Sequence, residues 1–207
     1  MISPPGSIGV AFTEAADGDQ RGDDAARLVV SDRLGITAQW ATVTQVHGNE
    51  VVFVNRPGDA GKADGLWTDR PGLPIAVFTA DCFGVVLVAD SAIGVAHAGW
   101  RGARAEVAER VRGEMAAAGH EPSKAYVGPG IGVCCFEVGR EVAEEFPHGL
   151  GTTIWGTTSV DIRSVIEGQL TQTMVSHLGG CTMHQDLWLS HRRDRTRERM
   201  ATIGWLP

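Results

Sequence analysis

The chain has 207 residues, of which 43% are hydrophobic and 21% charged, and its formal net charge is −7 at pH 7. This composition excludes a mainly disordered chain, and the acidic balance argues against a nucleic-acid-binding protein, which needs a basic face for the phosphates. No apolar run approaches the ~20 residues of a membrane span, and the N-terminus does not resemble a signal peptide. We therefore expect one domain, residues 1–207, in the cytoplasm.

The first half of the chain is expected to consist mainly of short strands. Runs rich in valine, isoleucine and phenylalanine are typical of strands, and glycines near their ends predict tight turns. In chain order we predict a strand at 8–12, a helix at 24–34, and strands at 40–45, 50–54, 75–78, 85–89 and 93–96.

The second half is expected to contain longer helices. In chain order we predict a helix at 103–118, a strand at 124–127, and helices at 139–146 and 161–178. Val107, Val111 and Met115 share one face of the first helix, while Asp161 is a suitable N-cap for the last. Strands and helices mix without strict alternation, so we predict an α/β to α+β fold, a single layered domain with mixed β-sheets flanked by helices.

Three residues with metal-binding side chains follow predicted strands. His47 follows the strand at 40–45, Cys82 the strand at 75–78, and His97 the strand at 93–96. Because ligand sites of α/β proteins gather where strands end, the three side chains could meet. Two imidazoles and one thiolate suit a borderline-soft cation and leave a fourth position open. Their separations match no compact metal motif, so spacing leaves open that all three are structural residues.

Five segments of the sequence resemble those of the YfiH-like family, also called the laccase-domain or peptidoglycan editing factor family. They are 44–48 (TQVHG), 63–66 (ADGL), 79–82 (TADC), 96–102 (AHAGWRG) and 128–139 (GPGIGVCCFEVG). The resemblance implies that His47, Cys82 and His97 are catalytic metal ligands. It also implies a purine nucleoside phosphorylase that uses phosphate and acts on adenosine, inosine, guanosine and methylthioadenosine, with adenosine deaminase activity. We expect Zn2+ rather than copper, and a monomer.

Further candidate residues lie close to these ligands in the sequence. Asp64 is a candidate general base or hydrogen-bond acceptor near the metal, or else a turn residue before Gly65. Arg101 and Gly102 stand near the start of the predicted helix at 103–118, where an anion such as phosphate is favoured, although Arg101 could equally form a structural salt bridge. Trp100 is a candidate for stacking on a purine, or a wall of the pocket. Gln45, beside His47, completes the expected substrate-binding set.

Other features have simpler interpretations. Adjacent Cys134 and Cys135 seldom bridge, so we expect them to be reduced and packed. The basic stretch 191–199 contains acidic residues and reads as a salt-bridged surface. Near the N-terminus, Phe12 and Thr13 are followed by Glu14, where the family usually carries a basic residue. This departure leaves open that activity is altered or lost.

Three alternatives to the phosphorylase remain. Cys82 could attack an amide, perhaps in a peptidoglycan precursor, as the nucleophile of a cysteine hydrolase or amidase. A copper polyphenol oxidase needs many imidazoles, and the chain has seven histidines with no close pair, so we discount it. The third alternative is a non-catalytic metal-binding homologue.

Overall fold

The strands of the computed structural model, which describes residues 1–4 and 9–207, form two large mixed sheets and a hairpin. The five-stranded sheet has the order β1 (Val10–Phe12), β13 (Met200–Gly204), β6 (Ile75–Thr79), β2 (Ala41–Thr44) and β4 (Gly58–Lys62). The six-stranded sheet has the order β12 (Met174–His177), β9 (Lys124–Val127), β7 (Phe83–Val88), β8 (Ile93–Ala98), β5 (Gly65–Thr68) and β3 (Val51–Phe53). The hairpin joins β10 (Leu150–Thr152) and β11 (Thr158–Val160).

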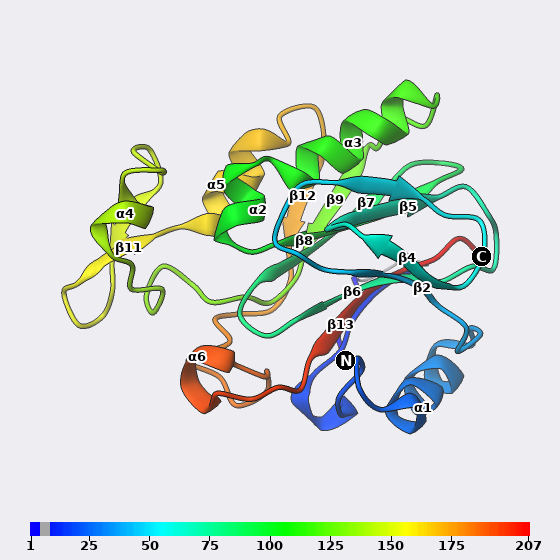
Figure 1. Ribbon diagram of the computed structural model, residues 1–207, viewed down its shortest axis with the longest axis horizontal. Helices are drawn as coiled ribbons and strands as arrows, with labels where there is room; N and C mark the ends of the chain where they lie inside the picture. Colours follow the sequence, from blue (N-terminus) through cyan, green and yellow to red (C-terminus); the bar gives the residue numbers. More distant parts are fainter. Residues whose placement is uncertain (5–8) are drawn as a thin grey trace.

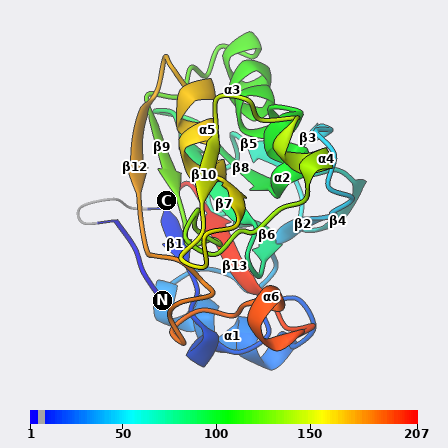
Figure 2. The same cartoon turned by 90° about the vertical axis from the view of Figure 1, so that its left-hand side faces the viewer.

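Helices lie on the outer faces of the two sheets and in the connecting segments. They are η1 (Ala15–Asp17), α1 (Asp24–Leu34), α2 (Trp100–Arg104), α3 (Val107–Ala117), α4 (Arg140–Ala143), α5 (Ile162–Gln169) and α6 (His191–Asp194). Both views place α3 and α5 on the side of the six-stranded sheet and α1 on the opposite side, beside the five-stranded sheet (Figures 1 and 2). The layers therefore run helix, sheet, sheet, helix.

Buried strands use both of their faces for packing. In β7, Val85 and Leu87 pack in the same cluster as the apolar residues of α3 and α5, whereas Val86 packs between the two sheets. In β6, Val77 faces the other sheet and Phe78 packs in the cluster that contains Val30 of α1. Since successive side chains point to opposite faces, a strand covered on both sides reads as a continuous apolar run. This explains why the central strands were predictable from the sequence.

The fold class is confirmed, because both large sheets contain parallel and antiparallel pairs. Most predicted strands are present, although the strand at 8–12 begins at Val10, and Ile8 lies outside the described residues. In the described part of the chain, no helix is long and apolar enough to cross a membrane.

The predicted helix at 103–118 is divided into two helices. It begins earlier, as α2 at Trp100, and breaks before α3, where Glu106 adopts a left-handed conformation with φ 59°. Carbonyls near the break are not left unpaired: Asn49 Nδ2 donates to Ala105 O at 2.9 Å, and Gln169 Nε2 donates to Ala103 O at 2.7 Å. Side chains distant in sequence therefore stabilise the break.

The predicted helix at 161–178 is wrong in its second half. Asp161 caps α5 as expected, accepting a hydrogen bond from Ser164 N at 3.1 Å, but the helix ends at Gln169. Met174–His177 instead form β12, which pairs in parallel with β9 at the edge of the sheet. The chain favours this outcome because β-branched threonine and valine residues follow Leu170, and an available sheet edge satisfies their backbone groups.

Candidate metal centre

His47, Cys82 and His97 meet in the folded chain. One donor atom from each of the three side chains lies within 4.8 Å of the others. His47 follows β2, Cys82 joins β6 to β7, and His97 belongs to β8. His47 and the neighbouring Asp81 hold positive φ angles of 61° and 88°. Such backbone conformations are uncommon for these residues and often mark functional sites.

A buried carboxylate organises two of the three donors. Asp64 is 0% exposed, and Oδ1 lies 2.7 Å from His97 Nδ1. The carboxylate also accepts hydrogen bonds from the backbone N–H groups of Val46, His47 and Gly48, at 3.1, 3.0 and 2.7 Å. The contact to Nδ1 leaves Nε2 as the free nitrogen of His97. A carboxylate behind a histidine in this way is typical of metal sites, where it fixes the orientation of the ring.

Cys82 and His97 influence each other's ionisation. Burial opposes ionisation of the Cys82 thiol, but the charge on His97 and hydrogen bonds from both imidazoles outweigh it and lower the pKa of Cys82 to about 6. Burial also opposes the charged form of His97, yet the Cys82 thiolate and the hydrogen bond to Asp64 raise the pKa of His97 to about 9. At neutral pH the pair is therefore thiolate and imidazolium, and a cation that binds both must displace the imidazole proton.

The space beside the donors fits a metal ion. A Cβ atom at Gly99 would lie 2.9 Å from Cys82 Sγ and 3.2 Å from His47 Cδ2, closer than normal side-chain contacts. Glycine therefore keeps this side of the cluster free. Two imidazoles and a thiolate are a donor set that zinc accepts, and three protein ligands leave one tetrahedral position for water or substrate.

The three donors line a cavity of about 400 Å³. Aromatic side chains on its wall are Phe78, Trp100 and Phe136, and the titratable ones besides the three donors are Arg21, Asp81, His191, Arg192 and Arg199. The basic stretch is thus more than the salt-bridged surface expected from the sequence, since three of its residues reach the cavity. Arg21 comes from the N-terminal region where the family's usual basic residue is missing.

Arg199 was missed as a residue of the cavity wall because β13 was not predicted. Arg199 directly precedes β13, so only the pairing of that strand with β1 and β6 brings it beside the metal donors. Arg192 is held by a hydrogen bond from its guanidinium to Glu137 O at 3.1 Å. The sequence signal was the density of arginines just before a short apolar run.

The expected substrate residues differ in their positions. Trp100 lines the cavity, and so does Gln45, whose amide is engaged in two 2.8 Å hydrogen bonds with the backbone of Phe78. Arg101 and Gly102 are not among the residues that line it. The Arg101 guanidinium lies 4.2 Å from the centre of the Trp100 ring, and Gly102 is buried close to His97 O. Asp64 also lies outside the cavity wall, in the position of a hydrogen-bond acceptor.

Comparisons with known proteins agree with this architecture. The sequence profile described as multi-copper polyphenol oxidoreductase laccase matches residues 11–207. A purine nucleoside phosphorylase of Streptomyces griseus is 36% identical, with 89% of this chain and 84% of that protein covered. The purine nucleoside phosphorylase YfiH of Escherichia coli is 33% identical, over 87% and 78% of the two chains.

Solved structures show the same fold. The crystal structure of the hypothetical protein YfiH from Bacillus licheniformis has a TM-score of 0.85 and 26% identity, covering 96% of this chain and 92% of that one. YlmD from Geobacillus stearothermophilus has a TM-score of 0.85 and 25% identity, covering 99% and 94%. The chain therefore belongs to the YfiH-like, laccase-domain family.

Proposed function

We propose that this protein is a zinc-dependent purine nucleoside phosphorylase that also deaminates adenosine. The observation that carries the proposal is the meeting of His47, Cys82 and His97 in the wall of a cavity of about 400 Å³. Relatives at 31–36% identity are named purine nucleoside phosphorylases, which supports the same reaction here. Adenosine, inosine, guanosine and methylthioadenosine are the proposed substrates.

In the proposed site, His47, Cys82 and His97 hold the zinc ion. When bound, zinc supplies Lewis-acid chemistry: it polarises the group at its open position and favours ionisation of water near neutral pH. Asp64 acts as a positioning residue, because its hydrogen bonds fix the His97 ring and the backbone on both sides of His47. Its buried carboxylate oxygens are occupied by donors, so we do not assign it the role of general base.

The arginines on the cavity wall are the proposed phosphate ligands. Phosphorolysis breaks the bond between the purine nitrogen and the anomeric carbon and joins that carbon to a phosphate oxygen, giving a free purine and a pentose 1-phosphate. Arg21, Arg192 and Arg199 can hold the phosphate dianion beside the sugar, since guanidinium groups bind phosphate oxygens with paired donors. Trp100 and Phe136 offer apolar faces for the purine. Arg101 and Gly102 are further candidates for contact with phosphate, although they do not line the cavity wall.

A product assay tests this function. Zinc-loaded protein is incubated with adenosine or inosine, with and without phosphate, and the bases and nucleosides are separated by chromatography. We expect adenine and hypoxanthine only when phosphate is present, and inosine from adenosine in either condition. Cys82→Ala serves as the inactive control. Base release that does not depend on phosphate would overturn the phosphorylase assignment.

One observation favours a second candidate, the cysteine hydrolase. Cys82, His97 and Asp64 are arranged as nucleophile, base and orienting carboxylate, and the pKa of Cys82 is lowered to about 6. Alkylation by iodoacetamide separates the two functions. A zinc ligand should resist alkylation in loaded protein and react in chelator-treated protein, half-maximally near pH 6. A free nucleophile should react equally in both preparations.

A further inference from the structure

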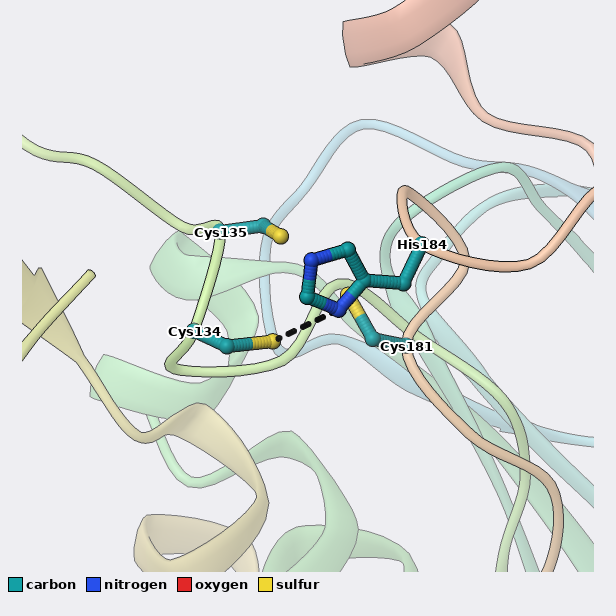
Figure 3. A group of neighbouring side chains, drawn as sticks. All are labelled: Cys134, Cys135, Cys181 and His184. Atoms are coloured by element: carbon teal, nitrogen blue, oxygen red, sulfur yellow. Dashed lines mark hydrogen bonds between the residues drawn. The ribbon is translucent and has the colours of Figure 1, made fainter. Parts of the chain in front are cut away.

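A second group of metal-binding side chains lies outside the three-donor cluster. It comprises Cys134, Cys135, Cys181 and His184, and one donor atom of each lies within 4.8 Å of the others. Figure 3 shows the four side chains converging from two separate segments. Cys134 Sγ lies 3.6 Å from His184 Nδ1. All four cysteines of the chain are free thiols, so no disulfide accounts for this convergence.

The backbone holds the two segments together. Gly130 and Cys181 form a parallel β-bridge, and Thr182 N donates to Gly130 O at 3.0 Å. Within the second segment, His184 N donates to Cys181 O at 3.2 Å, which closes a turn with the spacing Cys-x-x-His. This short spacing is typical of the ligand pairs in zinc sites. The main chain therefore holds the segment that carries Cys181 and His184 against the start of the loop that leads to Cys134 and Cys135.

The surroundings of Cys181 favour a thiolate. Gly132 N donates to Cys181 Sγ at 3.2 Å. Burial raises the pKa of Cys181, but hydrogen bonds from the backbone N–H groups of Gly132, His184 and Met183 outweigh it, so the pKa is lowered. The pKa values of Cys134 and Cys135 are raised, first by burial and then by the neighbouring sulfurs.

The distances and the number of donors fit one zinc ion. Two thiolates bound to tetrahedral zinc at ~2.3 Å are about 3.8 Å apart, so donors within 4.8 Å need only small shifts to share it. Four protein ligands also fill the coordination sphere, which is the mark of a structural site. We propose that Cys134, Cys135, Cys181 and His184 form a second, closed zinc site that fastens the segment 178–190 to the loop 129–139.

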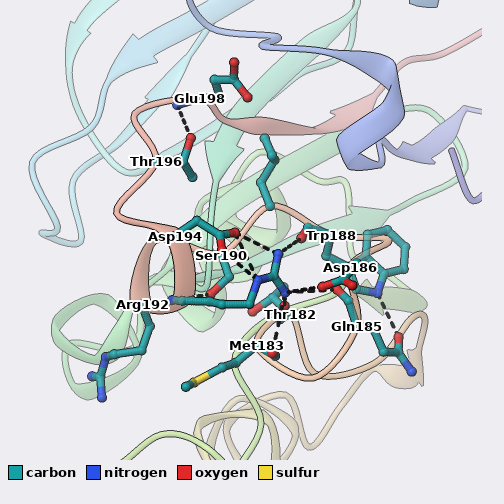
Figure 4. Close-up of polar contacts among 12 residues, drawn as sticks. Thr182, Met183, Gln185, Asp186, Trp188, Ser190, Arg192, Asp194, Thr196 and Glu198 are labelled. Carbon is teal, nitrogen blue, oxygen red and sulfur yellow. Dashed lines mark hydrogen bonds and ion pairs between the residues drawn. The ribbon is translucent and has the colours of Figure 1, made fainter.

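The segment fastened in this way supports the cavity wall. Thr182 Oγ1 donates to Asp81 Oδ1 at 2.7 Å, and Arg192 N donates to Asp81 Oδ2 at 2.6 Å. Asp81 directly precedes Cys82, so its carboxylate joins the neighbour of Cys82 to Thr182 of this segment and to Arg192. Figure 4 shows the polar contacts among residues between Thr182 and Asp194, with a separate contact between Thr196 and Glu198. Among them, Arg193 donates to Thr182 O at 2.8 Å and to Trp188 O at 3.0 Å. The second zinc site thus stabilises the contacts to Asp81 that help to position Arg192 and Cys82.

Zinc content is the direct test. Protein prepared with zinc under reducing conditions is analysed by native mass spectrometry and elemental analysis. We expect two zinc ions in wild type, one in Cys82→Ala, one in Cys181→Ala and none in the double variant. One ion in wild type and none in Cys82→Ala would overturn the second site. A mass of zinc-free Cys82→Ala that is lower by two hydrogen atoms, indicating a disulfide, would overturn it as well.

A second measurement remains informative if Cys181→Ala fails to fold. Co2+ is titrated into Cys82→Ala, and we expect thiolate-to-cobalt charge-transfer absorption with the intense visible bands of a tetrahedral site, saturating at one equivalent. His184→Ala, which removes an exposed side chain, should weaken the bands, whereas the matched variant of the exposed His148, His148→Ala, should not. Absence of these bands, or equal loss in both histidine variants, would overturn the site.

Discussion

The two clusters of cysteine and histidine differ in how they are held. His47, Cys82 and His97 lie at or near strand ends and depend on the buried carboxylate of Asp64, which contacts the His97 ring. Cys134, Cys135, Cys181 and His184 lie in loops, where a β-bridge and backbone N–H groups hold Cys181. The first cluster has three donors beside a cavity, and the second has four. An open site is suited to chemistry and a filled one to stability, so the two should respond differently to the same change.

Removing one thiol from each cluster should give the largest contrast. We expect Cys82→Ala to lower kcat/KM for phosphorolysis at least about a thousandfold, because the metal contributes several kcal/mol to the transition state. Cys181→Ala should lower it far less, by about tenfold, and should lower the melting temperature more than Cys82→Ala does. Initial rates and thermal melts check both expectations. Equal loss of activity in the two variants would remove the distinction between the clusters.

Asp64→Asn tests the carboxylate that only the first cluster has. The asparagine amide cannot accept hydrogen bonds at all the positions that Asp64 uses, so the His97 ring loses its fixed orientation. We expect zinc affinity at the open site to fall about 10–100-fold, measured by competition with a chromophoric chelator. Asp59→Asn, at an exposed carboxylate on β4, is the control and should bind zinc normally. Unchanged affinity in Asp64→Asn would show that the carboxylate does not position the ligand.

Arg192→Met probes the wall that connects the two clusters. Loss of its charged donors should raise KM for phosphate about tenfold with little change in KM for the nucleoside. Arg101→Met is the matched control: Arg101 stacks on Trp100 outside the cavity wall, so its KM for phosphate should change little. KM values are measured by steady-state kinetics. A larger rise in KM for phosphate in Arg101→Met than in Arg192→Met would place the phosphate site at Arg101 instead.

The first cluster could be predicted from the sequence more completely than the second. His47 and Cys82 follow buried apolar strands and His97 lies near the end of one, at positions that the sequence reveals, and the family motifs cover all three. Cys181 and His184 meet Cys134 and Cys135 only because a parallel bridge joins Gly130 to Cys181, and no local pattern encodes such a long-range pairing. The sequence therefore predicts that Cys134 and Cys135 are packed, but it does not identify a partner for either.

The same reason explains the remaining differences in the fold. The segment 161–178 has a continuous apolar stripe, yet its second half becomes β12 because the edge of β9 is available. β13 is a short run between β1 and β6, and its pairing determines where Arg199 lies. Local periodicity identifies most helices and the apolar strands β6, β7 and β8, whereas β12, β13 and the position of the arginines that precede β13 depend on tertiary pairing.

Thr182→Val should have the smallest effect. The substitution removes the buried hydroxyl that donates to Asp81 Oδ1 at 2.7 Å and leaves that oxygen with one partner fewer. We expect the free energy of unfolding to fall by about 1–3 kcal/mol, measured by urea denaturation. Thr171→Val, at an exposed position, should change it by less than about 0.5 kcal/mol. Equal stability of the two variants would indicate that the contact between Thr182 and Asp81 does not connect the clusters.

Anomalous diffraction at the zinc edge, from crystals of protein purified with zinc, shows directly whether the three donors hold the metal. We expect a peak bonded to His47, Cys82 and His97, at ~2.3 Å from the sulfur and ~2.0–2.1 Å from each nitrogen. Crystals in which fully occupied zinc lies elsewhere, with these three side chains bound to no metal, would contradict it.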